Sequence, residues 1–198
     1  MKEYKQTTEF TGAAASLLMV INHYKPDFEL SRENEFRIWL SSVDLPTRAC
    51  SVYGLASFAR RQGLVVEVYV GKQCYEYPDY RFKGYKKEEI EAATFTEDLH
   101  LRDLKELNIK IRGGEFSLDD VKELIFNNKI VMLRLDTGVF RSTKPSSNYV
   151  IVTNCGNFKF VIYDPYSGKI VVPEEKVKQS FEDLVLKRKR DHRMIVFG

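Results

Sequence analysis

The sequence predicts an α+β fold, with helices first and a mostly antiparallel sheet after them. A stretch of small and apolar residues over 12–24 indicates a buried helix near the start of the chain. β-branched runs dominate the second half, at 130–135, 148–154 and 158–164. Helices followed by strands in this order are typical of α+β domains. A length of 198 residues fits a single domain spanning 1–198.

Three helices are expected in the first third of the chain. The stretch 12–24 has little polar face, and Thr11 before it suits an N-cap whose hydroxyl accepts a backbone N–H two or three residues on. A second helix opens near residue 31. A third covers 51–62 and ends at Gly63, because glycine suits the left-handed position after a helix.

The later elements follow from periodicity, caps and turn residues. Alternation predicts a strand at 64–70, and a Tyr-, Gly- and Pro-rich stretch predicts a loop at 71–85. A charged amphipathic helix is expected over 87–107, with a break near Thr96. The remaining elements are a strand at 108–112, a helix with a capping signature from 117, a last helix with Pro173 at its first position, and a strand at 194–197.

Composition narrows the classes of function. The net charge of +3 is too small to predict nucleic-acid binding, and the basic run 187–190 reads as a solvated helix end. No apolar run approaches the roughly 20 residues that span a bilayer, and no signal peptide precedes the first helix. We therefore expect a cytoplasmic protein without a membrane partner. The 30% of charged residues with few glutamines hints at a thermophilic source.

The cysteines predict neither a disulfide framework nor a metal centre. Cys50, Cys74 and Cys155 are odd in number and lack metal-ligand spacing. No motif in the chain indicates a cofactor. We therefore expect no metal ion and no cofactor.

The N-terminal segment is the most informative part of the chain. It reads QTTEFTGAAAS from Gln6 to Ser16, so a polar strip with a glutamine enters a small-residue turn and then the buried helix. Three further motifs follow in order: CSVYGLA at 50–56, NYVIVT at 148–153 and FVIYDP at 160–165. On these motifs the chain resembles the C39-like peptidase group of the papain-like cysteine peptidase superfamily.

The resemblance implies a papain-like fold in which a nucleophile helix packs on a sheet that supplies the base and its orienting residue. Aligned on Gly12, the catalytic cysteine of the family falls on Thr11. Its histidine falls on Asn148 and its aspartate on Asp164. Gln6 takes the place of the oxyanion glutamine, about one residue closer to the nucleophile than is usual. The cysteine and the histidine of the triad are therefore both replaced.

These replacements argue against peptidase chemistry. A threonine hydroxyl needs an adjacent base, and the Asn148 amide cannot take a proton. We expect that amide to bridge Thr11 and Asp164 by hydrogen bonds, with the side chains of Thr11 and Asn148 within roughly 5 Å. Asp164 alone also fits ordinary turn chemistry before a proline. Cys50 is a rival nucleophile, because it precedes a helix and follows an arginine.

The resulting interpretation is a catalytically degenerate C39-like homologue, a pseudoenzyme that retains a cleft for binding a peptide or partner protein. One alternative is an active hydrolase or acyltransferase that uses Thr11 or Cys50 as nucleophile. Another is a structural subunit without a ligand.

Overall fold

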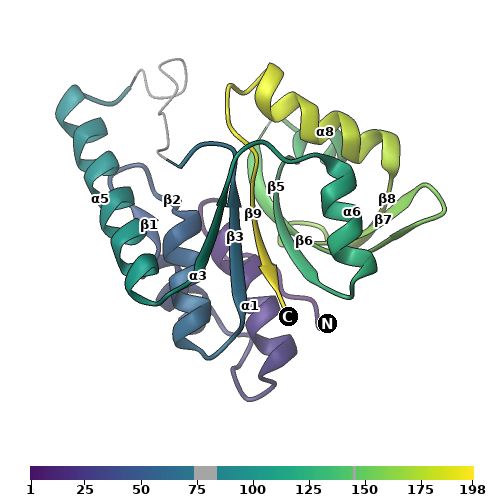
Figure 1. Cartoon of the computed structure of the whole chain (residues 1–198), viewed down its shortest axis with the longest axis horizontal. Helices are drawn as coiled ribbons and strands as arrows, with labels where there is room; N and C mark the ends of the chain where they lie inside the picture. Colours follow the sequence, from purple (N-terminus) through teal and green to yellow (C-terminus); the bar gives the residue numbers. More distant parts are fainter. Residues whose placement is uncertain (74–83, 145) are drawn as a thin grey trace.

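A seven-stranded sheet forms the centre of the molecule, as seen in Figure 1. The computed structural model describes residues 1–73, 84–144 and 146–198. The strand order is β4-β3-β9-β5-β6-β7-β8, and only β3 and β4 pair in parallel among the described neighbours. The strands are β3 (Val66–Val70), β4 (Lys110–Gly113), β5 (Ile130–Asp136), β6 (Ser147–Gly156), β7 (Lys159–Asp164), β8 (Gly168–Pro173) and β9 (Arg193–Phe197).

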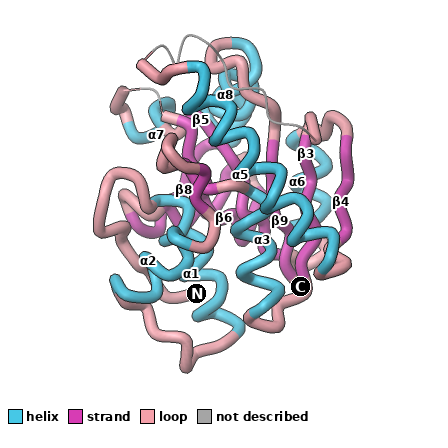
Figure 2. The backbone as a smooth tube through the Cα atoms, turned by 90° about the vertical axis from the view of Figure 1, so that its left-hand side faces the viewer, coloured by secondary structure: helices cyan, strands magenta, loops and turns pink. Residues whose placement is uncertain are grey.

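Helices cover both faces of the sheet. Seen from the side, the first group lies in front of the strands (Figure 2): α1 (Gly12–Tyr24), α2 (Arg32–Leu40), α3 (Val52–Arg61) and α5 (Lys87–Glu106). The opposite face carries α6 (Leu118–Phe126) and α8 (Glu174–Leu186) (Figure 1). The alternation of β6 divides the core, because Tyr149 and Ile151 pack on the α1 side while Val150 and Val152 pack on the α6 side. The expected α+β, mostly antiparallel architecture is confirmed.

The buried helix predicted at 12–24 is α1, and its bounds agree. Its first turns contain small residues, so the helix approaches the sheet closely. The Ser16 hydroxyl donates to the Tyr149 carbonyl at 2.9 Å and ties α1 to β6. This contact fixes the N-terminus of α1 beside the start of β6, which is the arrangement on which the site depends.

Several predicted boundaries were wrong, each for a local reason. Helix α5 runs unbroken through Thr96, because that hydroxyl donates to the Ala92 carbonyl at 2.9 Å within the helix. Pro173 ends β8 and occupies the N-cap of α8, not its first position. Elements too short or too polar to give a periodic signal were missed: β1 (Val43–Asp44), β2 (Ala49–Cys50), α7 (Gly138–Arg141) and β8.

Part of the predicted loop 71–85, including Cys74, lies outside the described residues. Gly63 has the expected left-handed conformation after α3, with φ of 85°. The capping box predicted at the start of α6 is present, and Ser117 accepts from the Asp120 N–H at 3.2 Å. Within the described part of the chain, no helix has the length and apolar character needed to cross a membrane.

Candidate functional site

A cleft of about 220 Å³ lies where the start of α1, the start of β6 and the β1–β2 turn meet. Phe10 and Ala13 form its wall on the α1 side, and Asn148 and Tyr149 form the β6 side. Arg48 contributes from the turn between β1 and β2. Three segments that are far apart in sequence therefore enclose one polar cavity. Of the four candidate positions Gln6, Thr11, Asn148 and Asp164, Asn148 lines it.

Asn148 faces the first turn of α1. Its Oδ1 atom lies 3.5 Å from the position that a Cβ on Gly12 would occupy. Its Nδ2 atom donates to the Ser146 hydroxyl at 2.9 Å and to the Thr137 hydroxyl at 3.3 Å. The expected amide bridge from Thr11 to Asp164 is therefore wrong. The amide nitrogen of Asn148 bonds instead to the hydroxyls of Ser146, just before β6, and Thr137, just before α7.

Thr11 is fully buried and its hydroxyl bonds locally. The Thr11 and Thr8 hydroxyl oxygens are 2.8 Å apart, and Thr11 also donates to the Thr8 carbonyl at 3.3 Å. Thr11 is the N-cap residue of α1, as expected, but the expected capping hydrogen bond from its hydroxyl is absent. The Thr11 hydroxyl therefore stabilises the preceding turn and not the helix end.

Gln6 is also engaged within the turn. Its Nε2 atom donates to the Thr8 carbonyl at 2.8 Å, and its backbone N–H donates to the Pro165 carbonyl at 2.8 Å. Its Oε1 atom lies 2.7 Å from where a Cβ on Gly12 would stand, and among the described residues it accepts no hydrogen bond. A carboxamide in this orientation presents an acceptor, not a donor, to the start of α1.

Asp164 is fully buried at the end of β7 and paired with Arg141 of α7. The Arg141 Nε atom donates to Asp164 Oδ2 at 2.9 Å, and Arg141 Nη2 donates to Oδ1. The backbone N–H groups of Tyr166 and Ser167 each lie 3.3 Å from a carboxylate oxygen. The turn chemistry that the sequence indicated is present, and a guanidinium fork is added to it.

Asn148 near the start of β6 and Asp164 at the end of β7 nevertheless lie at the same end of two adjacent strands. Ile151 pairs with Tyr163 in an antiparallel register, so the start of β6 lies beside the end of β7. The side chains of Asn148 and Asp164 make separate contacts there, because Arg141 occupies the carboxylate.

Asp136 holds the segment that leads into Asn148. Its Oδ1 atom accepts from the backbone N–H groups of Gly138 at 3.2 Å and Ser146 at 3.0 Å. Its Oδ2 atom accepts from Arg188 Nε at 2.8 Å, and Arg190 lines the cleft itself. The basic run 187–190 is therefore not only a solvated helix end, because two of its arginines support or line the site.

Cys50 lines the cleft at the end of β2. The N-cap of α3 is Ser51, whose hydroxyl accepts from the Tyr53 N–H at 3.2 Å. Burial raises the pKa of the Cys50 thiol to about 12. Burial outweighs the hydrogen bonds from Ser42 and from the Ala14 backbone in the first turn of α1, both of which lower the pKa of the thiol, so Cys50 is not activated as a nucleophile.

A buried ionic network beneath the cleft had no signal in the sequence. Arg193 on β9 donates to Glu97 of α5 at 2.7 Å and to Asp191 at 2.9 Å, and Arg134 of β5 donates to Asp191 at 2.7 Å. Asp44 adjoins Glu97, and burial together with the Glu97 charge raises the pKa of Asp44. Its members come from separate elements, so no spacing along the chain could identify it.

No histidine lines the cleft among the described residues. His192 is stacked on Phe181 with ring centroids 3.6 Å apart on the α8 side of the sheet. Its Nε2 atom lies 3.0 Å from the Phe181 carbonyl, and burial lowers its pKa. Within the described chain, no group of three or more His, Cys, Asp or Glu side chains is placed to hold a metal ion.

Comparison with known proteins identifies the family of the chain. A family described as "Peptidase_C39 like family" matches residues 1–198. No curated protein matches the sequence. A crystal structure of a double glycine motif protease from an AMS/PCAT transporter, in complex with the leader peptide, has a similar fold, with a TM-score of 0.51 and 13% identity. The match covers 100% of this chain and 91% of that one.

Proposed function

Because the chain belongs to the Peptidase C39-like family, we propose that it is a catalytically degenerate member whose cleft binds a peptide or a partner segment without cleaving it. The positions that match the family triad are Thr11, Asn148 and Asp164. Among the described side chains, Thr11 has no neighbouring base to activate its hydroxyl, because the Asn148 amide cannot take a proton.

The observation that carries the proposal is the separation of these three side chains into three local sets of contacts. Thr11 bonds to Thr8, Asn148 bonds to Thr137 and Ser146, and Asp164 is held by Arg141. Acyl transfer by a triad needs a nucleophile bonded to a base and a base bonded to its orienting carboxylate. Here neither bond is made among the described residues, and the carboxylate is neutralised by a guanidinium.

Peptide binding is supported by the rim of the cleft. Phe10 lines the cleft, and its ring centroid lies 5.0 Å from Trp39 and 6.4 Å from Phe36. The Arg48 guanidinium lies 5.3 Å from the Phe10 centroid. Aromatic groups beside a polar cavity suit an extended peptide with apolar side chains. The double glycine motif protease of similar fold was crystallised with a leader peptide, which is consistent with this class of ligand.

Hydrolysis and binding assays test the proposal together. The purified protein is incubated with a fluorogenic peptide library, between about pH 5 and 9, and with the same peptides in a binding assay. We expect binding that Phe10→Ala weakens, and hydrolysis no faster than the buffer blank. Robust cleavage that Thr11→Ala abolishes would place the protein among active hydrolases.

An alternative is an active hydrolase or acyltransferase that uses Cys50, and its position in the cleft wall is the observation in its favour. An iodoacetamide-based probe separates this reading from the first. Labelling of Cys50 near neutral pH that a bound peptide blocks, and that Cys50→Ser removes, would support it. The thiol pKa of about 12 leads us to expect no such labelling. A protein that neither binds nor cleaves any peptide would be the structural subunit.

A further inference from the structure

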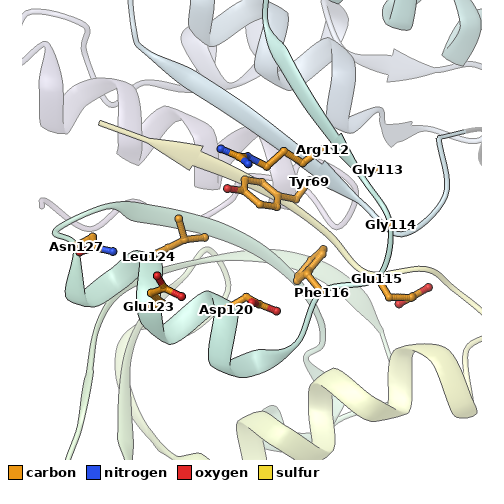
Figure 3. A pocket seen from close by; sticks show the side chains of 10 residues that line it. All are labelled: Tyr69, Arg112, Gly113, Gly114, Glu115, Phe116, Asp120, Glu123, Leu124 and Asn127. Atoms are coloured by element: carbon orange, nitrogen blue, oxygen red, sulfur yellow. The ribbon is translucent and has the colours of Figure 1, made fainter.

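A second concave surface lies on the α6 side of the sheet, as Figure 3 shows. It has a volume of about 380 Å³ and runs between strands β3 and β4 on one side and helix α6 on the other. We call it the acidic groove, and define it by Tyr69, Arg112, Phe116, Glu115, Asp120 and Glu123. It shares no lining residue with the cleft. A ligand here would therefore not depend on the chemistry at Thr11 and Asn148.

The floor of the groove is aromatic and held in place. Tyr69 and Phe116 meet edge to face, with ring centroids 6.2 Å apart. Phe116 is supported from behind by Phe181 at 5.9 Å and His192 at 5.7 Å. Rings fixed by their neighbours lose little conformational entropy when a ligand binds. The floor thus offers a preformed apolar and π-electron surface.

The walls of the groove are negatively charged in a protein whose net charge is +3. Glu115, Asp120 and Glu123 are all exposed, and Figure 3 shows Asp120 and Glu123 on successive turns of α6. Among the described lining residues Arg112 is the one cation, and Glu67 neutralises it, with Oε2 2.9 Å from Arg112 Nε. The Arg112 guanidinium covers one face of the Tyr69 ring, 5.4 Å from its centroid. The groove is therefore complementary to positive charge.

These carboxylates have few partners of their own. Within the described residues the Glu123 side chain makes no hydrogen bond or ion pair, and Glu115 lies 3.6 Å from His192 Nδ1 without a hydrogen bond. Asp120 directs Oδ2 to the Ser117 N–H and hydroxyl, both at 2.7 Å, which leaves Oδ1. A cationic ligand would thus meet carboxylates that are not already committed to the fold.

The backbone leaves room for a chain to lie along the groove. Among the described strands β4 is at the edge of the sheet and pairs with β3 alone. A Cβ added to Gly113 or Gly114 would meet no atom within 4 Å, so neither residue is there to fit a neighbouring side chain. Open backbone beside an edge strand suits an extended peptide.

We propose that the acidic groove docks an extended basic segment of a partner protein, with a lysine or arginine side chain placed between the carboxylates of α6 and the side of the Tyr69 ring away from Arg112. Ammonium and guanidinium groups are attracted both by aromatic faces and by carboxylates, which are the two features that the groove combines. An acidic or apolar segment would gain only one of them. A second copy of this chain is the competing occupant.

The test uses two fluorescein-labelled peptides, one alternating lysine with serine and one alternating glutamate with serine. Binding to the full chain is measured by fluorescence anisotropy at low and at moderate salt. We expect the lysine peptide to bind more tightly than the glutamate peptide, and its affinity to fall as salt rises. Equal affinity of the two peptides, or no binding of either, would overturn the proposal.

Two variants localise the binding. Glu123→Lys reverses an exposed charge that supports no other contact, and we expect it to weaken the lysine peptide about fivefold or more. Glu106→Lys, at the exposed end of α5, makes the same change in net charge outside the groove and should leave affinity unchanged. Equal loss in both variants would mean that the protein attracts the peptide non-specifically.

A third variant and a mass measurement separate the remaining outcomes. Tyr69→Leu keeps an apolar side chain but removes the π-face, so we expect it to weaken the lysine peptide while Glu106→Lys does not. Light scattering reports the mass of the protein in solution. Self-association that Glu123→Lys abolishes, together with no binding of the lysine peptide, would assign the groove to a second copy and overturn the proposal.

Discussion

Arg141 and Asp164 form a buried, two-pronged ion pair between α7 and the end of β7. Side-chain exposure is 7% for the arginine and 0% for the aspartate. The pair occupies the Asp164 carboxylate, which we propose corresponds to the aspartate of the family triad. A carboxylate held in this way keeps the end of β7 in place, whatever residue stands at position 148.

Removing the arginine alone should destabilise the protein strongly. Arg141→Ala leaves the Asp164 carboxylate buried without its cation, and we expect a loss of about 3–5 kcal/mol in the free energy of unfolding. Adding Asp164→Asn should recover part of that loss, because the buried charge is gone. Urea denaturation measures both, with Arg102→Ala, an exposed change in α5, as the control. A loss as small as that of the control would show that the pair does not stabilise the fold.

The family relationship predicts that a thiol at position 11 responds to an imidazole at position 148. Thr11→Cys combined with Asn148→His places the two groups beside the first turn of α1, and an imidazolium there lowers the pKa of the thiol below about 8.5. We expect alkylation by iodoacetamide at lower pH in the double variant than in Thr11→Cys alone. Turnover is not expected, because Arg141 holds Asp164.

A substitution at Arg141 tests whether Asp164 contributes to this effect. If the carboxylate is to orient the imidazole, it must first be released, so the alkylation shift should grow when Arg141→Gln is added to the double variant. Identical alkylation profiles for Thr11→Cys with and without Asn148→His would mean that position 148 does not act on position 11.

Gly12 and Gln6 should be coupled in stability. A Cβ at Gly12 would stand 2.7 Å from Gln6 Oε1, so Gly12→Ala must displace the glutamine side chain. Once Gln6→Ala removes that side chain, alanine at 12 should be neutral or stabilising, by up to about 1 kcal/mol, because glycine is the poorer helix former. Thermal unfolding of the two single variants and the double variant measures the coupling. Strict additivity would place the Gln6 carboxamide elsewhere.

Asp44 should make the protein less stable as the pH rises. Burial and the nearby Glu97 charge raise its folded pKa above the unfolded value, so the folded state binds more protons between those two values. Its contribution is therefore most favourable below the unfolded pKa and is lost progressively up to the folded pKa. The slope is at most about 1.4 kcal/mol per pH unit.

Asp44→Asn tests this sign. The amide mimics the protonated acid, can donate to Glu97, and does not titrate. We expect the variant to gain stability over the parent as the pH increases from about 4 towards neutral, measured by urea denaturation at each pH. Asp98→Asn, an exposed change in α5, serves as the control. A constant difference between Asp44→Asn and the parent at all pH values would contradict the prediction.

The fold was largely predictable from the sequence. Helix α1 was predicted because a continuous run of small and apolar residues can only be buried, and β5, β6 and β7 because β-branched runs suit a covered sheet. Residues of the motifs at positions 6–16, 50–56 and 148–153 line the cleft, whereas the motif at 160–165 contributes none of its described lining residues. The residue runs and motifs are local properties of the chain, and local properties are encoded in sequence spacing.

The contacts made by the site residues were decided only by tertiary structure. Asn148 bonds to Thr137 and Ser146, and Asp164 bonds to Arg141, where the sequence suggested a bridge between Thr11 and Asp164. Short elements such as α7 have too few residues for a periodic signal, yet α7 contains Arg141, which pairs with Asp164. Hydrogen-bond partners are chosen by distance in space, and nothing in the spacing of residues along the chain records that distance.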